Sequence, residues 1–184
     1  DASPELKTQL ETVLGVLQDS INETRTLARG LNPADHAGGG FITGLTHFTG
    51  EARKLYEIEI ALHIEMSEAD IPEKTATHLH HIVQESVNNA VRHGHASTIT
   101  ISLSKLNSGT GLLTIQDNGR GFEAQSEDTP RVGMGLRLMR YRTDLIGGEF
   151  EASSCPTEGV KLSCTFAIQQ AATGTANVSA PRSQ

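Results

Sequence analysis

Polar residues at helical spacing form the first segment of this sequence whose residue types suit chemistry. Four side chains stand at i, i+4, i+7 and i+8 and share one face if the segment is an α-helix: Glu85, Asn89, Arg92 and His93. A carboxylate, an amide and two possible cations suit a magnesium-bound triphosphate, because Mg²⁺ keeps most of its waters and takes few protein oxygens. A solvated helix face is the alternative interpretation of this segment alone.

The second candidate is an acidic turn after an apolar strand pattern. Asp117 follows the run from Leu112 to Ile115, and Gly119 and Gly121 permit close backbone approach to a flat ligand. A buried carboxylate here can accept a hydrogen bond from the exocyclic amine of adenine. Guanine presents an oxygen at that position, so the acid favours ATP over GTP. Taken alone, Asp-Asn-Gly is better explained as a simple turn.

The third candidate is a glycine pair at the start of a helical pattern. Gly133 and Gly135 flank Met134, and the backbone N–H groups from Met134 to Leu136 can face phosphate at the positive end of the helix. Such a glycine pair is common, and its weight comes from its position shortly after the Asp117 turn. We expect the residues between the two motifs to form a short mobile lid.

Hydrophobic periodicity predicts the elements that must position these residues. The predicted helices lie around residues 41–55, 72–94 and 135–146, and the predicted strands at 57–65, 98–103, 111–116, 149–153 and 160–168. Most of the strands are consecutive, so the sheet should be mixed and mostly antiparallel, with helices on one face. The expected fold class is α+β.

Two terminal segments lie outside this pattern. Apolar or small residues recur with alternating four-three spacing from Leu10 to Leu31, which predicts a long N-terminal helix of a bundle or coiled coil, ended by Pro33. The alternative is that this seam packs on its own domain. The tail at 169–184 is rich in Ala, Thr, Ser and Gly and is predicted to be disordered.

Composition narrows the class of protein. The 184 residues suit one compact domain with a helical appendage, and the net charge of -7 disfavours nucleic acid as a partner. No run approaches the ~20 apolar residues of a membrane span. Cys155 and Cys164 have no metal-binding spacing, which is typical of a reducing cytoplasm. They could approach each other across a strand turn, although two separate buried thiols are the simpler interpretation.

The three motifs, in this order and spacing, resemble those of the gyrase, Hsp90, histidine kinase and MutL (GHKL) ATPase superfamily. Residues 85–93 resemble its N box, residues 117–122 its G1 box and residues 133–136 its G2 box, and the following Arg137 to Arg140 resembles the NarL/DesK-like sensor kinases. The resemblance extends to about Ile168. It implies a GHKL or Bergerat-type α/β sandwich over 34–168.

The resemblance also implies roles for individual residues. By this resemblance Asn89 is the ligand of Mg²⁺, Arg92 and His93 face the phosphates of ATP, and Asp117 recognises adenine. Glu85 occupies the position of the superfamily's general base. In the hydrolases that base activates water, whereas towards the histidine substrate of a kinase Glu85 is a candidate only.

Residues 1–33 resemble the second helix of the dimerisation and phosphotransfer bundle of these kinases. The first helix would carry a histidine followed by an acidic residue, and no such pair occurs in residues 1–31. We therefore expect the phosphoacceptor and any membrane segment to lie outside this chain, which alone would not autophosphorylate. The implied setting is a homodimer in the cytoplasmic part of a membrane-associated sensor, with a response regulator as partner.

One departure from the family pattern lies in the closing strand. Val160 stands where relatives have a threonine after the last glycine, and it cannot offer a hydroxyl to a water beside adenine. Ser163 or Thr165 could supply that hydroxyl instead. Two other functions remain open: a conformational ATPase related to gyrase or MutL, and an ATP-sensing interaction module without phosphotransfer.

Overall fold

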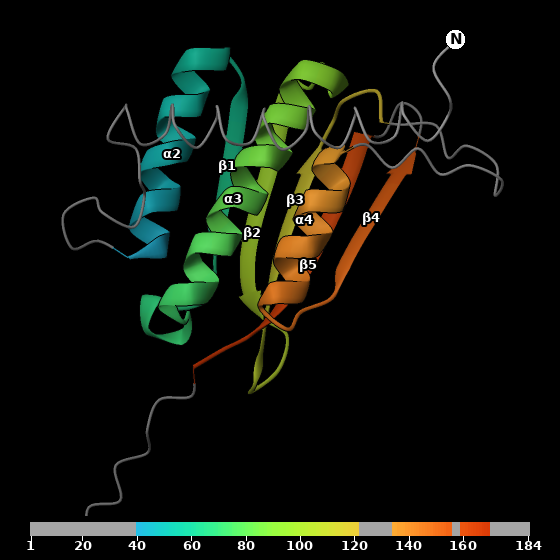
Figure 1. The fold of residues 1–184 in the computed structure, drawn as a ribbon. Coiled ribbons are helices and arrows are strands. Elements are labelled where there is room, and N and C mark those ends of the chain that lie inside the picture. The colour runs from blue at the N-terminus through green and yellow to red at the C-terminus, as the bar shows by residue number, and fades with distance from the viewer. Residues whose placement is uncertain (1–39, 122–133, 156–158, 170–184) are drawn as a thin grey trace, which may run out of the picture.

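A computed structural model describes residues 40–121, 134–155 and 159–169. These residues form two layers, a single sheet and three α-helices that all cover the same face of it (Figure 1). The predicted N-terminal helix, the predicted lid between the Asp117 turn and Gly133, and nearly all of the predicted disordered tail lie outside the described residues.

The sheet has the strand order β1-β2-β3-β5-β4. Its strands are β1 (Glu59–Ile64), β2 (Thr98–Lys105), β3 (Thr110–Asp117), β4 (Phe150–Cys155) and β5 (Gly159–Ala167). β1 and β2 are parallel, and the three other neighbouring pairs are antiparallel. The predicted mixed, mostly antiparallel sheet with helices on one face is confirmed.

The α-helices are α2 (Phe41–Tyr56), α3 (Glu73–Asn89) and α4 (Met134–Leu145). Two short helical segments accompany them, a 3-10 turn η1 (Glu68–Asp70) and a π-helical turn η2 (Ala90–Gly94). Each helix bound lies within a few residues of its prediction. The first strand begins two residues later than predicted, because Glu57 adopts a left-handed conformation (φ 54°) that ends α2.

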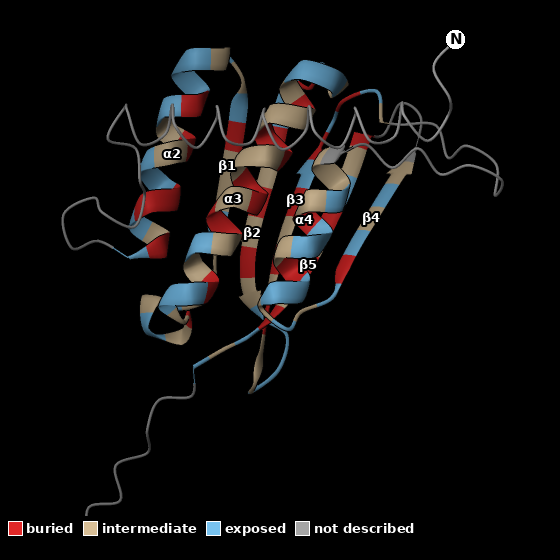
Figure 2. Ribbon diagram, viewed as in Figure 1, coloured by how far each residue is buried: buried red, intermediate tan, exposed pale blue. Residues whose placement is uncertain are grey.

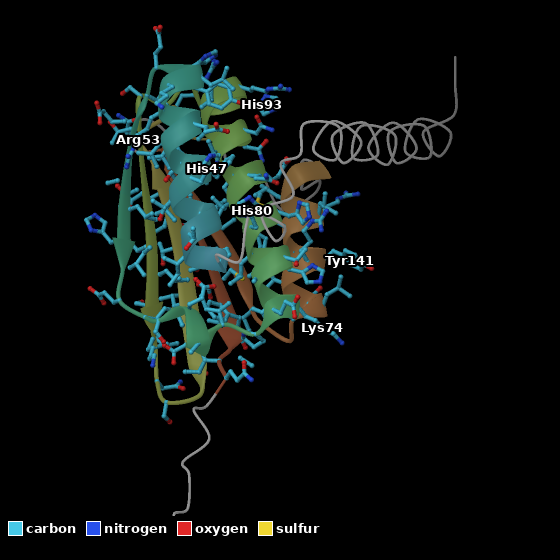
Figure 3. The ribbon with its side chains drawn as sticks, turned by 90° about the vertical axis from the view of Figure 1, so that its left-hand side faces the viewer. His47, Arg53, Lys74, His80, His93 and Tyr141 are labelled. Atoms are coloured by element: carbon cyan, nitrogen blue, oxygen red, sulfur yellow. The ribbon has the colours of Figure 1, made fainter. Side chains whose placement is uncertain are left out.

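The core lies between the sheet and the helices (Figure 2). Alternation along β2 turns Ile99, Ile101 and Leu103 to the helix side, where each is fully buried. From α3, the side chains of Leu79 and Val83 meet them in the same core. Thr100 and its even-numbered neighbours in β2 face the uncovered side of the sheet, which the helices leave open (Figure 3).

The helix predicted over residues 72–94 has the expected extent but not a uniform geometry. It is α-helical to Asn89 and then continues as the π turn η2, after which His95 is left-handed (φ 51°). The amide of Ala96 closes this end by donating to the carbonyl of Ala90 at 3.0 Å. Such π turns inside helices occur frequently at functional sites.

The two cysteines cannot form a disulfide. Cys155 pairs with Gly159 at one end of β4, whereas Cys164 pairs with Phe150 at the other end. Their Cα atoms are therefore about 17 Å apart by the rise of a strand, and a disulfide needs roughly 4–7 Å. Cys164 is a buried free thiol whose pKa is raised by burial.

Candidate functional site

The three candidate segments meet at one edge of the sheet, where α3 and β3 end and α4 begins (Figure 1). Two close approaches of backbone to side chain define the meeting point. A Cβ placed on Gly94 would lie 3.7 Å from Oδ1 of Asp117, and one placed on Gly135 would lie 2.3 Å from Oε1 of Glu85. Residues from three separate stretches of sequence therefore share one site.

Asp117 is the buried acid of this site, with 8% of its surface exposed. Its Oδ1 accepts hydrogen bonds from the amide of Gly119 at 2.8 Å and from the amide of Val160 at 3.3 Å. Both bonds end on the same oxygen. The carboxylate is thus held by the backbone through Oδ1, and Oδ2 takes part in neither bond.

Glycine backbone packs closely around this carboxylate. Gly159 has φ +83°, and a Cβ on it would lie 2.0 Å from the carbonyl oxygen of Asp117. A Cβ on Gly119 would lie 2.7 Å from the carbonyl oxygen of Gly94. Gly121, the other glycine of the turn, has φ 68°, a conformation that few other residues adopt.

Two residues that the sequence interpretation passed over attach this turn to η2 and to the start of β2. The side-chain oxygen of Asn118 accepts from the amides of Ser97 and Thr98, each at 2.9 Å. Arg120 donates its amide to the carbonyl of Gly94 at 3.0 Å and its Nε to the carbonyl of His93 at 3.1 Å. The tendency of Asn to bind nearby backbone amides in turns could have identified Asn118.

Glu85 and Asn89 face the start of α4, as their i, i+4 spacing predicts. A Cβ on Gly135 would lie 2.9 Å from Nδ2 of Asn89 as well as against the Glu85 carboxylate. Glu85 and Asn89 are both half-buried. The carboxylate and the amide therefore lie side by side beneath the first turn of α4.

That Arg92 and His93 share a face with Glu85 and Asn89 stays a prediction, because the regular α-helix ends before them. Both lie in the π turn η2, which has more residues per turn than an α-helix. Both side chains are exposed, and Figure 3 shows His93 at the end of α3.

The start of α4 lies where the glycine motif predicts it. The helix begins at Met134, and Gly133 lies outside the described residues. Leu136 is half-buried against the core, and Sδ of Met139 accepts a hydrogen bond from the hydroxyl of Ser86 on α3 at 3.2 Å. These contacts hold the N-terminal turn of α4 against α3.

Neither Ser163 nor Thr165 can replace the missing hydroxyl of Val160, so this expectation is wrong. Side chains alternate along β5, where Val160 and the buried Leu162 lie on the helix side. Ser163 and Thr165 therefore face the other side of the sheet, away from Asp117. The hydroxyl of Thr165 instead accepts a hydrogen bond from the amide of Glu149 at 2.8 Å.

The donor set fits a magnesium ion shared with a nucleotide better than an ion held by protein alone. The described residues contain no group of three or more His, Cys, Asp or Glu that could hold a metal ion. Asn89 offers one amide oxygen beside the Glu85 carboxylate. One or two protein oxygens are typical where phosphates and waters complete the shell of Mg²⁺.

The described site places a buried acid at the end of the central strand, beside the polar end of one helix and the start of another, and this arrangement suits a nucleotide. Residues 74–170 match the family described as "Histidine kinase-, DNA gyrase B-, and HSP90-like ATPase", and the chain belongs to this family. The sandwich fold is the one that the motifs imply, and the chain is an ATP-binding domain of the histidine kinase type.

Sensor kinases are among the similar sequences. The sensor histidine kinase LiaS of Bacillus subtilis (strain 168) is 33% identical over 162 residues, 88% of this chain and 44% of LiaS. The sensor protein VraS of Staphylococcus saprophyticus is 32% identical, over 86% of this chain and 45% of VraS. The chain thus spans less than half the length of these relatives.

Solved structures share the fold at lower sequence identity. The ATP binding domain of PrrB from Mycobacterium tuberculosis has a TM-score of 0.56 and 22% identity, over 66% of this chain and 89% of that domain. The histidine kinase domain of the Erythrobacter litoralis EL346 blue-light activated kinase has a TM-score of 0.57 and 18% identity, over 69% of this chain and 60% of that domain. No helix within the described ranges is long and apolar enough to cross a membrane.

Proposed function

We propose that this chain binds Mg-ATP at the edge of its sheet and that, in the whole protein, it transfers the γ-phosphoryl group to a histidine. A response regulator would then receive that group on an aspartate. The observation that carries the proposal is that Asp117 is a buried acid and that the amides of two described residues hold it through Oδ1.

Oδ2 of Asp117 would accept a hydrogen bond from the exocyclic amine of adenine. Gly119 and Gly159 themselves present no side chain to the carboxylate, which suits the approach of a flat base. Guanine has a carbonyl oxygen at the corresponding position. That oxygen and the carboxylate oxygen of Asp117 are both acceptors, so they would repel each other. ATP should therefore bind more tightly than GTP.

The phosphates of ATP would lie between the end of α3 and the start of α4. Asn89 would hold Mg²⁺ through its amide oxygen, and when bound the ion neutralises phosphate charge. The exposed side chains of Arg92 and His93 and the first amides of α4, from Met134 to Leu136, would face phosphate oxygens. Gly133 would extend this backbone surface.

Glu85 is the candidate base for the transfer. It would accept a proton from the attacking imidazole while the γ-phosphoryl group leaves ADP. In the rival conformational ATPase, the same carboxylate would activate water instead. The similarity to LiaS and VraS, both named as sensors, favours the kinase. An ATP-sensing module without phosphotransfer is the non-enzymatic rival.

The organisation of the whole protein belongs to the same proposal. Residues 1–33 would form the second helix of a dimerisation bundle, and the ATP-binding domain would extend over 34–168. The assignment to the NarL/DesK-like branch depends on the motif from Gly133 to Arg140. The domain would work in the cytoplasm, attached to a membrane through segments that this chain does not include.

Calorimetry with ATP and GTP in the presence of Mg²⁺ tests the binding step. Tighter binding of ATP supports the proposal, and equal affinity for both nucleotides removes Asp117 from its role. A protein extended by the preceding helix then tests the transfer. Acid-labile phosphate on a histidine indicates a kinase, steady release of inorganic phosphate without labelling indicates the ATPase, and binding with neither indicates the sensing module.

A further inference from the structure

Position 160 of the nucleotide site carries a valine, whereas the family pattern places a hydroxyl there. The β3–β5 register, with Gln116 opposite Lys161, continues to Asp117 beside Val160. The Val160 amide donates to Asp117, but its side chain is aliphatic and can neither donate nor accept a hydrogen bond. Ser163 and Thr165 lie on the other face of the sheet and cannot supply this hydroxyl.

A serine on the next strand lies on the correct face. Ser154 of β4 pairs directly with Val160 of β5, and paired residues in neighbouring strands project to the same side of a sheet. On β4 the helix side carries Phe150 and Ala152 as well, and both pair with β5 residues that are buried there. Ser154 is thus the hydroxyl residue on the helix side of β4.

Ser154 also contacts the backbone that surrounds Asp117. Its Oγ donates to the carbonyl of Gly159 at 3.3 Å, and Gly159 packs directly against the carbonyl of Asp117. Strands lie about 4.8 Å apart, so the Cα atoms of Asp117 and Ser154 are about 10 Å apart. A purine with one bridging water can span this separation.

We propose that Ser154 recognises the base of the bound nucleotide and supplies, from β4, the hydroxyl that position 160 lacks. The hydroxyl donates to Gly159 and accepts a hydrogen bond from a water that bridges to the purine ring. This inference rests on the proposed binding of ATP, and it adds a specificity-determining residue from the strand beyond Val160.

A matched pair of serine variants tests this inference. Ser154→Ala should weaken binding of Mg-ATP by about three- to tenfold, the effect of one lost neutral hydrogen bond. Ser153→Ala is the control, because Ser153 also donates to a β5 carbonyl, that of Lys161 at 3.4 Å, but from the opposite face of the sheet. Its affinity for ATP should equal that of the wild type.

A second substitution separates base recognition from a structural effect. Val160→Thr restores a hydroxyl beside Asp117, so in the Ser154→Ala background it should return the affinity to within about twofold of the wild type. The loss in Ser154→Ala should also be equal with Mg²⁺ and with EDTA, because the base side of ATP does not touch the metal. A purely structural role would lower the thermal midpoint and would not be rescued by Val160→Thr.

Equal ATP affinity for Ser154→Ala and the wild type would overturn the inference, as would an equal loss in Ser153→Ala. Either result would leave ATP binding itself intact, provided that Asp117→Asn still weakens it. A wild-type chain that binds no ATP would instead refute the proposed function, and the inference with it. Rescue by Val160→Thr together with an unaffected Ser153→Ala supports Ser154 as the recognising residue.

Discussion

The carboxylate of Glu68 caps the first turn of α2 by accepting a hydrogen bond from the amide of Ile42 at 2.8 Å. Helix α2 has no capping side chain and no acid of its own in that turn, so this residue of the η1 turn supplies both the acceptor and the negative charge. The η1 turn also contacts the last described residue, since the carbonyl of Asp70 accepts a hydrogen bond from the amide of Gln169 at 2.8 Å.

Removing this cap should destabilise the domain. We expect Glu68→Ala to lower the free energy of unfolding by about 1 kcal/mol, as for other helix caps. Glu65→Ala, at an exposed position just after β1, is the control and should have little effect. Gly40→Ala should resemble Glu68→Ala, because its Cβ would lie 2.1 Å from the Glu68 carboxylate. Urea denaturation measures all three, and an unchanged midpoint for Glu68→Ala would contradict the capping role.

Replacing Asp117 by Asn should weaken ATP binding by about 1.5–3 kcal/mol, roughly ten- to a hundredfold, and reduce the preference for ATP over GTP. Asn keeps a side-chain oxygen for the amides of Gly119 and Val160, so the fold should persist. The loss would arise from the missing charge opposite the adenine amine. Calorimetry measures both nucleotides, and Asp144→Asn, on the exposed side of α4, is the control. An unchanged ratio of affinities would argue against base recognition by Asp117.

Replacing Asn89 by Ala should reduce nucleotide binding in Mg²⁺ far more than binding in EDTA, because a metal ligand acts only through the metal. Asn88→Ala is a suitable control. Its side chain accepts a hydrogen bond from the hydroxyl of Tyr56 at 3.2 Å, so it serves the contact between α2 and α3. Parallel titrations in the two buffers make the comparison. Equal losses in both buffers would assign Asn89 to folding or to the base.

Two glycines with positive φ separate backbone strain from close packing. Gly147 (φ +67°) has open space around its Cβ position, so Gly147→Ala should cost about 1–2 kcal/mol of stability from the left-handed conformation alone. Gly159→Ala meets the same strain and also the carbonyl of Asp117, and should cost about 1–3 kcal/mol more. It should weaken ATP binding as well. Equal thermal shifts for the two variants would show that the Gly159 contact relaxes without cost.

Buried His80 should make the domain sensitive to acid. Its ring packs edge-on against Phe41 and Phe48, and within the described ranges neither ring nitrogen has a hydrogen-bond partner. Burial, with a smaller contribution from His81, lowers the pKa of His80 from 6.5 to about 4. The unfolded chain therefore binds this proton at a higher pH than the folded one. Stability should be complete above pH 6.5 and fall as the pH drops towards 4.

His80→Leu removes this titrating group and tests its contribution. Relative to the variant, the wild type should lose on the order of 2 kcal/mol of unfolding free energy between pH 7.5 and pH 5. At pH 7.5 the variant should be at least as stable, since an unpaired polar group has left the core. Urea denaturation at the two pH values provides the measurement. Parallel pH dependence in the two proteins would show that His80 is hydrated in the folded state.

Local periodicity was sufficient to determine the elements of this protein. The apolar spacing of α3 and the alternation of β2 depend on a few neighbouring residues, so both elements could be predicted from sequence. The order of the polar motifs indicated an ATP-binding site for the same reason, because each motif is contiguous. Asp117 in particular follows an apolar strand, and burial at the end of that strand is a local expectation.

The tertiary structure alone decided how the contacts at the site are made. The Val160 amide reaches Oδ1 of Asp117 only because β5 pairs with β3 in one register, and the same register turns Ser163 away and Ser154 towards the site. A shift of one residue would have reversed each of these faces. Arg92 lies in the π turn η2, and this turn likewise contacts the Asp117 turn, where the amide of Arg120 donates to the carbonyl of Gly94. Partners distant in sequence set these features, and no local pattern contains them.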